Sequence, residues 1–239
     1  MLATAILAGG LATRLRPLTE TIPKALVEIN GKPFLAHQLH LLRRAGVTRV
    51  VLCVGYLGQM IRDFAGSGSQ FGMDIDYSFD GERLLGTAGA IRRALPMLSE
   101  AFFVIYGDSY LPCNYGDVER AFTAAGKPGL MTVYQNEGRW DASNVEYFEG
   151  RILRYDKASR TPDMRHIDYG LGVFQASVFA GLDGDQAYDL AALYQGLHQR
   201  DELAGYEVSE RFYEIGSYQG IRDLEAYLSA HRDAPQASF

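Results

Sequence analysis

The first 106 residues alternate between short apolar runs and amphipathic segments, and this order restricts the fold more than any other feature of the chain. Short apolar runs are typical of buried strands, whereas apolar residues that recur every three or four positions are typical of helices. The predicted order is strand 4–8, helix 33–45, strand 50–54, helix 58–64, strand 73–79, helix 87–95 and strand 102–106. Because strands joined through helices run parallel, we expect an α/β fold, a three-layer α/β/α sandwich with a mostly parallel central sheet.

The helix predicted at 33–45 illustrates the local signals. Pro33 can occupy the first turn of a helix, where an N–H group is not needed, and Leu35, Leu39 and Leu42 recur at helical spacing. Gly46 can end the helix. Residues 9–23 contain Gly, Thr and Pro without a regular period, so this segment is predicted to be a loop after the first strand.

The second half of the chain has a different pattern, with short strand candidates separated by Gly and charged residues. The predicted elements are strands 130–134, 145–148, 152–155, 171–175 and 212–215, and a helix at 221–230. No linker-like stretch or internal repeat divides the chain. We therefore predict one domain over residues 1–239, with a smaller β-rich part inserted into the sheet and a terminal helix packed on the core.

The composition is that of a folded globular protein, with 47% hydrophobic and 22% charged residues. The net charge is -6 and the basic residues are scattered, which argues against a binding surface for long nucleic acids. Cys53 and Cys113 have neither metal-binding nor redox spacing. The apolar N-terminus lacks a basic segment and no apolar run is long enough to span a membrane, so we expect a soluble cytoplasmic protein without membrane partners.

The loop after the first strand carries groups that suit a phosphate ligand. Gly9 and Gly10 let main-chain N–H groups approach an anion closely, and Arg14 and Lys24 add cations to the same loop. The loop is not a Walker-type P-loop, because no Gly-Lys-Ser/Thr follows, and it lacks the third glycine of the dinucleotide-binding fingerprint. A loop of this kind can cradle a triphosphate.

The longer string around this loop is more specific than the two glycines. Gly-Gly-x-x-x-Arg-Leu-x-Pro-Leu-Thr, followed by Pro-Lys, resembles the signature of the sugar 1-phosphate nucleotidyltransferases, also called nucleoside-diphosphate-sugar pyrophosphorylases. The resemblance covers roughly residues 3–228. It implies a Rossmann-like fold with a nucleotide-binding part at about 1–110, a sugar-binding part at about 111–215 and a C-terminal helix at about 221–230. It also implies an enzyme that uses Mg²⁺ to join a nucleoside triphosphate to a sugar 1-phosphate with release of pyrophosphate.

The resemblance assigns residues to the nucleotide and to the chemistry. Arg14, Lys24 and Asp108 are implied as catalytic residues. The nucleotide-binding residues implied by the loop and by the segment Gly86–Ala90 are Leu7, Ala8, Gly9, Gly10, Gly86, Thr87 and Ala88. Thr87 can also cap the helix that this segment begins.

Asp108 is the first metal ligand that the resemblance implies. It follows the apolar strand 102–106 through Gly107, which places an acid at the carboxyl edge of a parallel sheet, where ligands bind. Members of the family more often carry Asn where Tyr106 stands, which puts one side-chain contact in doubt. The second implied ligand is Glu214, at a place where family members usually have Asp. Because Mg²⁺ tolerates little error in oxygen distances of about 2.1 Å, either the backbone compensates for the longer side chain or Glu214 binds through water.

Three further segments resemble the family's sugar-phosphate contacts. The implied residues are Ser143, Asn144, Asp156, Lys157, Tyr169 and Gly170. An acid can accept hydrogen bonds from sugar hydroxyls while a lysine meets the phosphate, although a surface ion pair between Asp156 and Lys157 is the simpler alternative. Residues 161–166 lie where substrate specificity varies in the family.

Several interpretations of the product stay open. Residues 58–63 and 72–73 resemble muramate 1-phosphate uridylyltransferases, whereas residues 85–91 and 213–216 resemble D-glycero-D-manno-heptose 1-phosphate guanylyltransferases, our leading interpretation. Another hexose 1-phosphate is a further option, and the chain is expected to be a monomer or a homodimer. Two other classes are a non-catalytic nucleotide-sugar-binding regulator and a glycosyltransferase. The glycosyltransferase is expected to have an Asp-x-Asp motif, and Asp108-Ser109-Tyr110 lacks the second acid.

Overall fold

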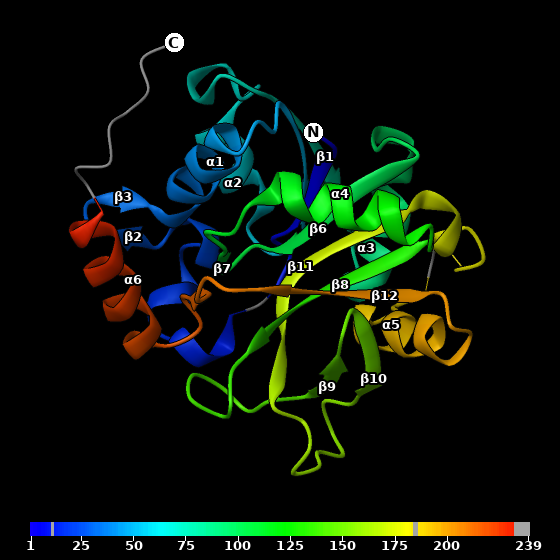
Figure 1. Cartoon of the computed structure of the whole chain (residues 1–239). Helices are drawn as coiled ribbons and strands as arrows, with labels where there is room; N and C mark the ends of the chain where they lie inside the picture. The colour runs from blue at the N-terminus through cyan, green and yellow to red at the C-terminus, as the bar shows by residue number, and fades with distance from the viewer. Residues whose placement is uncertain (11, 184–185, 232–239) are drawn as a thin grey trace.

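The computed structural model of the chain describes residues 1–10, 12–183 and 186–231. A nine-stranded sheet lies at its centre (Figure 1). Its strands are β1 (Ala3–Leu7), β4 (Arg49–Val54), β5 (Asp74–Phe79), β6 (Ala101–Tyr106), β8 (Gly129–Gln135), β9 (Val145–Phe148), β10 (Arg151–Tyr155), β11 (His166–Gln175) and β12 (Leu203–Val208).

The direction of the strands confirms a mostly parallel sheet. In the order β6-β1-β4-β5, every neighbouring pair is parallel. β11 pairs antiparallel with β6, β8 and β9, and β12 is parallel to β8, so only β10 and β11 run against the other strands of the described sheet. The β-rich second half is therefore continuous with the sheet, and β9 and β10 form a hairpin beside β11 (Figure 1).

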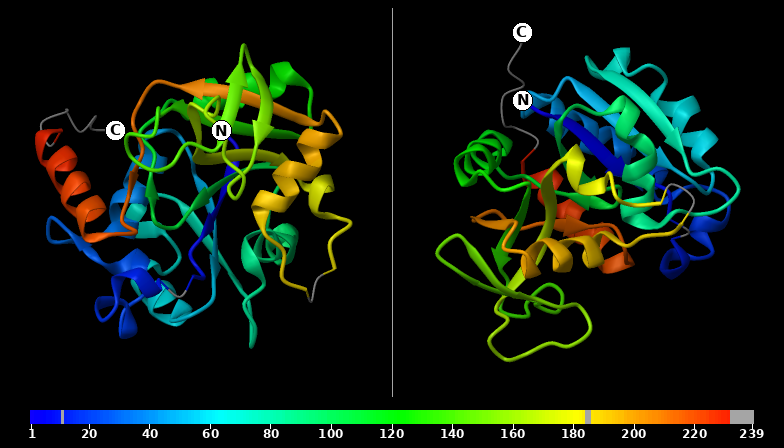
Figure 2. Two further views of the ribbon diagram at one scale, coloured as in Figure 1. Left: turned by 90° about the horizontal axis from the view of Figure 1, so that it is seen from below. Right: turned by 90° about the vertical axis from the view of Figure 1, so that its right-hand side faces the viewer.

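Helices cover both faces of this sheet, as Figure 2 shows. Successive side chains of a strand point to opposite faces. In β4, Val50 and Leu52 therefore pack in one buried cluster with α1 (Phe34–Arg44), α2 (Gly58–Ala65) and α4 (Tyr115–Ala125). Val51 and Cys53 pack in the other cluster with α3 (Gly86–Ala94) and α5 (Leu190–Gln199). This arrangement confirms the three-layer sandwich.

The end of the chain packs back on its beginning. α6 (Tyr218–Ala230) contacts β13 (Tyr213–Glu214) and β2 (Glu28–Ile29), which pairs with β3 (Lys32–Pro33). Phe34, Tyr110, Ile215 and Leu224 form a third buried cluster there. β13 also pairs antiparallel with β7 (Ser109–Tyr110), so this packing brings residue 214 beside residues 108 and 109.

Most predicted elements are present, with ends that differ by a few residues. The prediction for Pro33 was wrong, because its extended backbone (φ -53, ψ 139) places it in β3, before the helix. The predicted loop at 9–23 contains short 3₁₀ turns at Thr13–Leu15 and Leu18–Glu20, and a third turn follows at Lys24–Leu26. Three of the longer elements, α4, α5 and β12, were not predicted, nor were the two-residue strands β2, β3 and β7.

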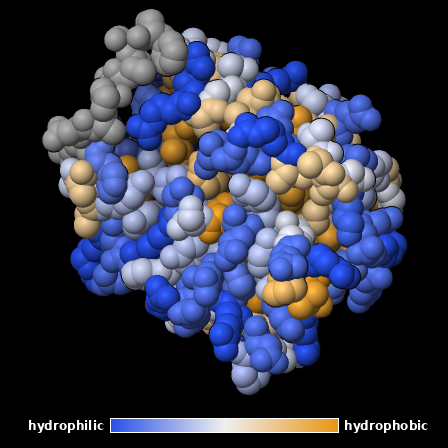
Figure 3. Space-filling view, viewed as in Figure 1, coloured by the Kyte–Doolittle hydropathy of each residue, from blue (hydrophilic) through white to orange (hydrophobic). Residues whose placement is uncertain are grey.

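On the face drawn in Figure 3, hydrophobic residues appear in small groups among hydrophilic ones. Within the described ranges, every helix is too short or too polar to cross a bilayer.

Candidate active site

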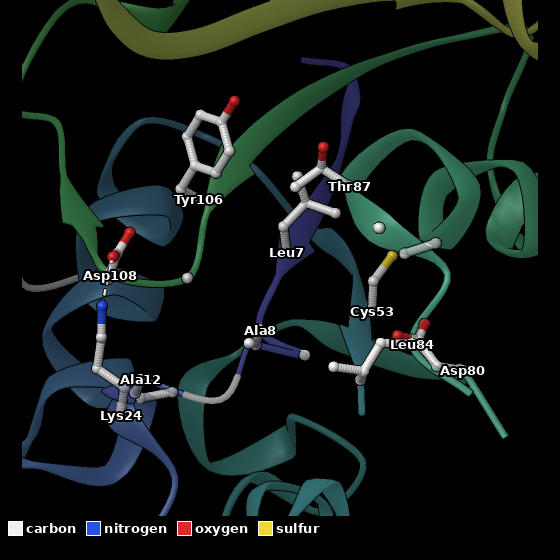
Figure 4. Close-up of a pocket in the computed structure, with 16 residues that line it drawn as sticks. Leu7, Ala8, Ala12, Lys24, Cys53, Asp80, Leu84, Thr87, Tyr106 and Asp108 are labelled. Carbon is white, nitrogen blue, oxygen red and sulfur yellow. Dashed lines mark hydrogen bonds and ion pairs between the residues drawn. The ribbon is translucent and has the colours of Figure 1, made fainter. Parts of the chain in front are cut away.

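A cavity of about 250 Å³ opens at the carboxyl ends of β1, β4 and β6 (Figure 4). β1 has β4 on one side and β6 on the other, so the chain turns in opposite directions from this strand. The crevice at such a reversal is the usual ligand site of open α/β sheets. The cavity is lined by Leu7, Ala8, Gly9, Gly10, Ala12, Lys24, Ala25, Cys53, Asp80, Leu84, Gly86, Thr87, Ala90, Tyr106, Gly107 and Asp108.

Glycines allow the strand ends to meet closely at the floor of this cavity. The N–H of Gly107 donates to the carbonyl of Leu7 at 2.9 Å, and a Cβ on Gly107 would lie 2.7 Å from that carbonyl oxygen. A Cβ on Gly55 would lie 2.9 Å from the carbonyl oxygen of Gly9. Leu7, Ala8, Gly9 and Gly10, the loop residues predicted to bind the nucleotide, all line the cavity.

The two predicted cations come together at one end of the cavity. The Lys24 ammonium lies 2.8 Å from a carboxylate oxygen of Asp108. A Cβ on Gly216 would lie 3.6 Å from the guanidinium of Arg14 and 3.9 Å from Lys24 Nζ, so both cations border the same glycine. Arg14 is exposed and has no ion pair among the described residues. Its charge is therefore available to an anion.

The two predicted metal ligands also become neighbours. The N–H of Ile215 donates to the carbonyl of Asp108 at 3.0 Å, and Glu214 pairs with Ser109 between β13 and β7. Burial against the protein and the Asp108 carboxylate raise the pKa of Glu214 to about 7, whereas Lys24 and Arg14 lower it. The side chain of Glu214 nevertheless keeps contact with solvent. Two close acids with accessible oxygens are a donor set that suits a hard divalent cation.

The start of α3 forms the opposite end of the cavity. Gly86 and Thr87 line it, whereas Ala88 is buried and its N–H donates to the carbonyl of Tyr188 at 2.9 Å. The idea that Thr87 caps its own helix was wrong, because α3 begins at Gly86 and has no side-chain cap. The Thr87 hydroxyl instead accepts a hydrogen bond from the N–H of Leu190 at 2.7 Å, at the first residue of α5.

The residues expected to meet the sugar phosphate gather near the start of β11. Asn144 Oδ1 accepts from the N–H of Asp168 at 2.9 Å, and the N–H of Asp156 donates to the carbonyl of Asn144 at 3.1 Å. Lys157 Nζ lies 3.8 Å from a carboxylate oxygen of Asp168 and 5.8 Å from the ring centroid of Tyr106. Because Tyr106 lines the cavity, this group of residues adjoins it.

Two of these side chains are engaged in their own loops. Ser143 Oγ accepts from the N–H of Gly138 at 3.1 Å. Asp156 Oδ1 accepts from the N–H groups of Ala158 and Ser159, each at 2.8 Å, and these bonds lower the pKa of the carboxyl. Asp156 therefore forms no ion pair with Lys157 among the described residues.

The last two members of the set lie at an irregularity of β11. Tyr169 is only 2% exposed, and its ring packs against Tyr134 and Phe212 in the core. Its side chain therefore does not face a ligand, and only its main-chain atoms could contact one. Gly170 has φ +95, and a Cβ there would lie 3.6 Å from the ring of Tyr106. A contact of that length is ordinary, so it is the positive φ, and not a lack of space, that favours glycine at this position.

Two buried acids of this region were not in the predicted set of site residues, although Asp168 begins one of the segments that resemble the family's sugar-phosphate contacts. Asp80 lines the cavity and is 6% exposed, and the side chain of Asp168 is 4% exposed beside Lys157. Asp80 follows directly after β5, just as Asp108 follows β6 after one glycine. An acid at the carboxyl end of a predicted parallel strand was therefore a signal that could have found it.

Comparisons with known proteins identify the family of this chain. Residues 3–141 match the nucleotidyl transferase family. The chain is 29% identical over 232 residues to N-acetylmuramate alpha-1-phosphate uridylyltransferase of Neisseria meningitidis serogroup B, covering 94% of this chain and 97% of that relative. It is 34% identical to the mannose-1-phosphate guanylyltransferase catalytic subunit beta of Danio rerio, over 97% of this chain but only 66% of the relative's length.

A solved structure shows the same fold. The crystal structure of HddC from Yersinia pseudotuberculosis complexed with GMP-PN has a TM-score of 0.78 at 22% identity, over 95% of this chain and 100% of that chain. Since the family match spans more than half of the 239 residues and includes the glycine loop, Lys24 and Asp108, the chain belongs to the nucleotidyl transferase family and is a nucleotidyltransferase.

Proposed function

We propose that this enzyme transfers a nucleotidyl group from a nucleoside triphosphate to a sugar 1-phosphate, giving a nucleotide sugar and pyrophosphate. The observation that carries the proposal is the meeting of Arg14, Lys24, Asp108 and Glu214 at one end of a cavity whose floor is main chain. Cations and preorganised N–H groups in one place suit the charge of a triphosphate. The relatives described above act on sugar 1-phosphates by name, which supports the same substrate class here.

In the proposed reaction, a phosphate oxygen of the sugar 1-phosphate attacks the α-phosphorus in line, and the bond to the pyrophosphate oxygen breaks. No protein nucleophile is needed. Burial raises the pKa of the Cys53 thiol to about 12, so the one thiol that lines the described cavity stays protonated and unreactive. Lys24 and Arg14 hold the triphosphate and stabilise the negative charge that builds on the leaving pyrophosphate.

Asp108 and Glu214 would hold Mg²⁺. Their fit rests on geometry and donor type: the pairing of β13 with β7 sets Glu214 beside Ser109 and Asp108, and carboxylate oxygens are the donors that a hard divalent cation prefers. When bound, the ion neutralises phosphoryl oxygens and orients them for the in-line transfer. Asp108 is also paired with Lys24 at 2.8 Å, so the lysine holds its carboxylate in place.

The sugar 1-phosphate is proposed to bind beside Lys157, with Asn144, Asp168 and Gly170 forming the neighbouring wall. D-glycero-D-manno-heptose 1-phosphate with GTP remains the leading pair, and the ligand bound to HddC, GMP-PN, is a guanine nucleotide. Muramate 1-phosphate with UTP is the alternative, supported by the Neisseria meningitidis relative. In either case we propose a cytoplasmic enzyme that supplies activated sugars for cell-envelope polysaccharide.

A pyrophosphate-release assay tests this proposal. The enzyme is incubated with Mg²⁺, each of the four nucleoside triphosphates and a panel of sugar 1-phosphates, with Asp108→Asn as the inactive control. We expect pyrophosphate release with only one or a few pairs of nucleoside triphosphate and sugar 1-phosphate. The productive pair identifies the base and the sugar. A non-catalytic regulator would bind nucleotide sugars without any release, and this result would overturn the proposal.

A further inference from the structure

Asp80 is a buried acid at the end of the cavity that the proposed chemistry does not use. Figure 4 shows it with Leu84 on the opposite side of the cavity from Lys24 and Asp108. Its N–H donates to the carbonyl of Val54 at 2.9 Å, which continues the pairing of β5 with β4 by one residue. The phosphate-binding groups lie at one end, so this acid lies where the nucleoside end of a triphosphate would extend.

The carboxylate of Asp80 packs against glycines. Its Oδ2 atom lies 3.2 Å from the position of a Cβ on Gly55 and 3.4 Å from that of a Cβ on Gly9. A larger residue at Gly55 would also meet Leu84 at 2.8 Å. The absence of side chains at these two positions therefore leaves room for the carboxylate beside the ends of β1 and β4, across the cavity from Lys24.

Most of the acceptor capacity of this carboxylate is unused. The N–H of Leu85 donates to Oδ2 at 3.4 Å, and within the described residues Asp80 takes part in no ion pair. Arg93 attracts the acid but donates to the carbonyl of Phe79 at 3.3 Å. Burial raises the pKa of Asp80, while Leu85 and Arg93 lower it. A carboxylate can accept about four hydrogen bonds, so a ligand with N–H groups would satisfy a group that the protein itself leaves nearly unbonded.

The walls around Asp80 suit a flat ring. Cys53, Leu84 and Ala90 line this end of the cavity, and the cysteine behaves as a small apolar residue because its thiol stays protonated. Leu84 is 43% exposed, so its side chain can close over a ligand without leaving a packed core. Apolar walls with one polar group that fixes orientation are typical of small-molecule sites.

The bases differ in what they present to a carboxylate. Guanine has N1–H and N2–H₂ side by side, two donors that match two carboxylate oxygens. Uracil has one N–H between two carbonyl oxygens. In adenine and cytosine, the amino group stands beside a ring nitrogen that accepts hydrogen bonds. Each of these three bases would therefore place a lone pair against the carboxylate. We propose that Asp80 is a specificity-determining residue that accepts hydrogen bonds from guanine, making GTP the nucleotide substrate, an inference that rests on the proposed function.

The test compares kcat/KM for GTP, UTP, CTP and ATP with the productive sugar 1-phosphate, and measures binding of GDP and UDP by calorimetry. The wild-type enzyme is expected to favour GTP. Asp80→Asn is expected to lower the GTP-to-UTP ratio by roughly 5- to 150-fold, the range of one bidentate base contact, and to weaken GDP binding in parallel. Glu82→Gln, an exposed acid two residues away, is the matched control and should keep the wild-type ratio.

Two results would overturn the inference: a wild-type preference for another base, or an Asp80→Asn enzyme with an unchanged GTP-to-UTP ratio. Either leaves the proposed function intact as long as pyrophosphate is released. If no pair releases pyrophosphate but GDP binding still depends on Asp80, the proposed function is wrong and the base selection is upheld. Should Asp80→Asn fail to fold, the wild-type ranking of bases and the smaller variant Asp80→Ser decide the question.

Discussion

The ammonium of Lys24 lies 2.8 Å from a carboxylate oxygen of Asp108, and this ion pair joins the turn after the glycine loop to the end of β6. The side chains are 16% and 27% exposed, so the pair is partly screened from water. Its two members are the residues to which we assign phosphate binding and metal binding. The pair therefore holds both groups in place before any ligand arrives.

Lys24→Ala is expected to lower kcat by about two to three orders of magnitude while the protein stays folded, because it removes one preorganised cation from the transition state. Pyrophosphate release and thermal melting measure the two effects. Lys127→Ala is the control, since Lys127 forms an ion pair of the same 2.8 Å length with Asp201 at the surface. Wild-type turnover in Lys24→Ala would show that this residue has no catalytic role.

Removal of Mg²⁺ by a chelator is expected to abolish pyrophosphate release, and added Mg²⁺ to restore it. Glu214→Gln should raise the Mg²⁺ concentration needed for half-maximal activity, because an amide oxygen carries no charge for the ion. Binding of Mn²⁺ to the protein, followed by paramagnetic resonance, provides a readout independent of turnover. Equal Mn²⁺ affinity in the wild type and the variant would show that Glu214 is not a ligand.

Gly86→Ala is expected to destabilise the protein by more than the cost of a left-handed residue, which is about 1–2 kcal/mol. Gly86 has φ +69, and a Cβ there would lie 2.5 Å from the carbonyl oxygen of Tyr188. Gly138→Ala separates the backbone strain from the steric clash, since Gly138 has φ +72 but no atom within 4 Å of its Cβ position. Urea unfolding measures the loss of stability in both variants. Equal losses would mean that the main chain at Tyr188 moves away from the new methyl group at little cost.

Asp168→Asn is expected to stabilise the protein at neutral pH. Burial raises the pKa of Asp168, and Lys157 and the N–H of Gly170 only partly oppose this. Between the ordinary pKa and the raised one, the unfolded chain loses its proton first, so the free energy of unfolding falls as pH rises. The advantage of the variant should therefore be absent in acid and grow as pH rises through the folded-state pKa.

Denaturant unfolding at a series of pH values checks this expectation. Asp201→Asn is the matched control, for which the effect of pH on the free energy of unfolding is expected to have the opposite sign. The reason is that the hydrogen bond from Lys127 lowers the pKa of Asp201. That carboxylate contributes stability that is present above its ordinary pKa and lost as pH falls. A stability gain for Asp168→Asn that does not vary with pH would indicate a packing effect instead of a charge effect.

The parallel core of the fold was predictable because its signals are local. β1, β4 and β6 are continuous apolar runs, and α1 shows helical spacing over its whole length. β12 was missed because its sequence contains Ala, Gly and Glu, and it becomes a strand by pairing along its whole length with β8. α4 had usable signals that were overlooked, an Asn114 cap and Gly126 after its last residue.

Residue types and short spacings in the sequence already indicate a loop with two glycines and two cations, an acid after an apolar strand and the class of chemistry they serve. Tertiary structure decides which of these groups meet. Glu214 lies beside Asp108 only because α6 and β13 pack back against β7. Asp80 becomes a candidate for base recognition only because β5 ends next to the glycines that follow β1 and β4. The physical reason is that backbone and apolar patterning act over a few residues, whereas burial, pKa shifts and unsatisfied acceptors arise from segments far apart in the chain.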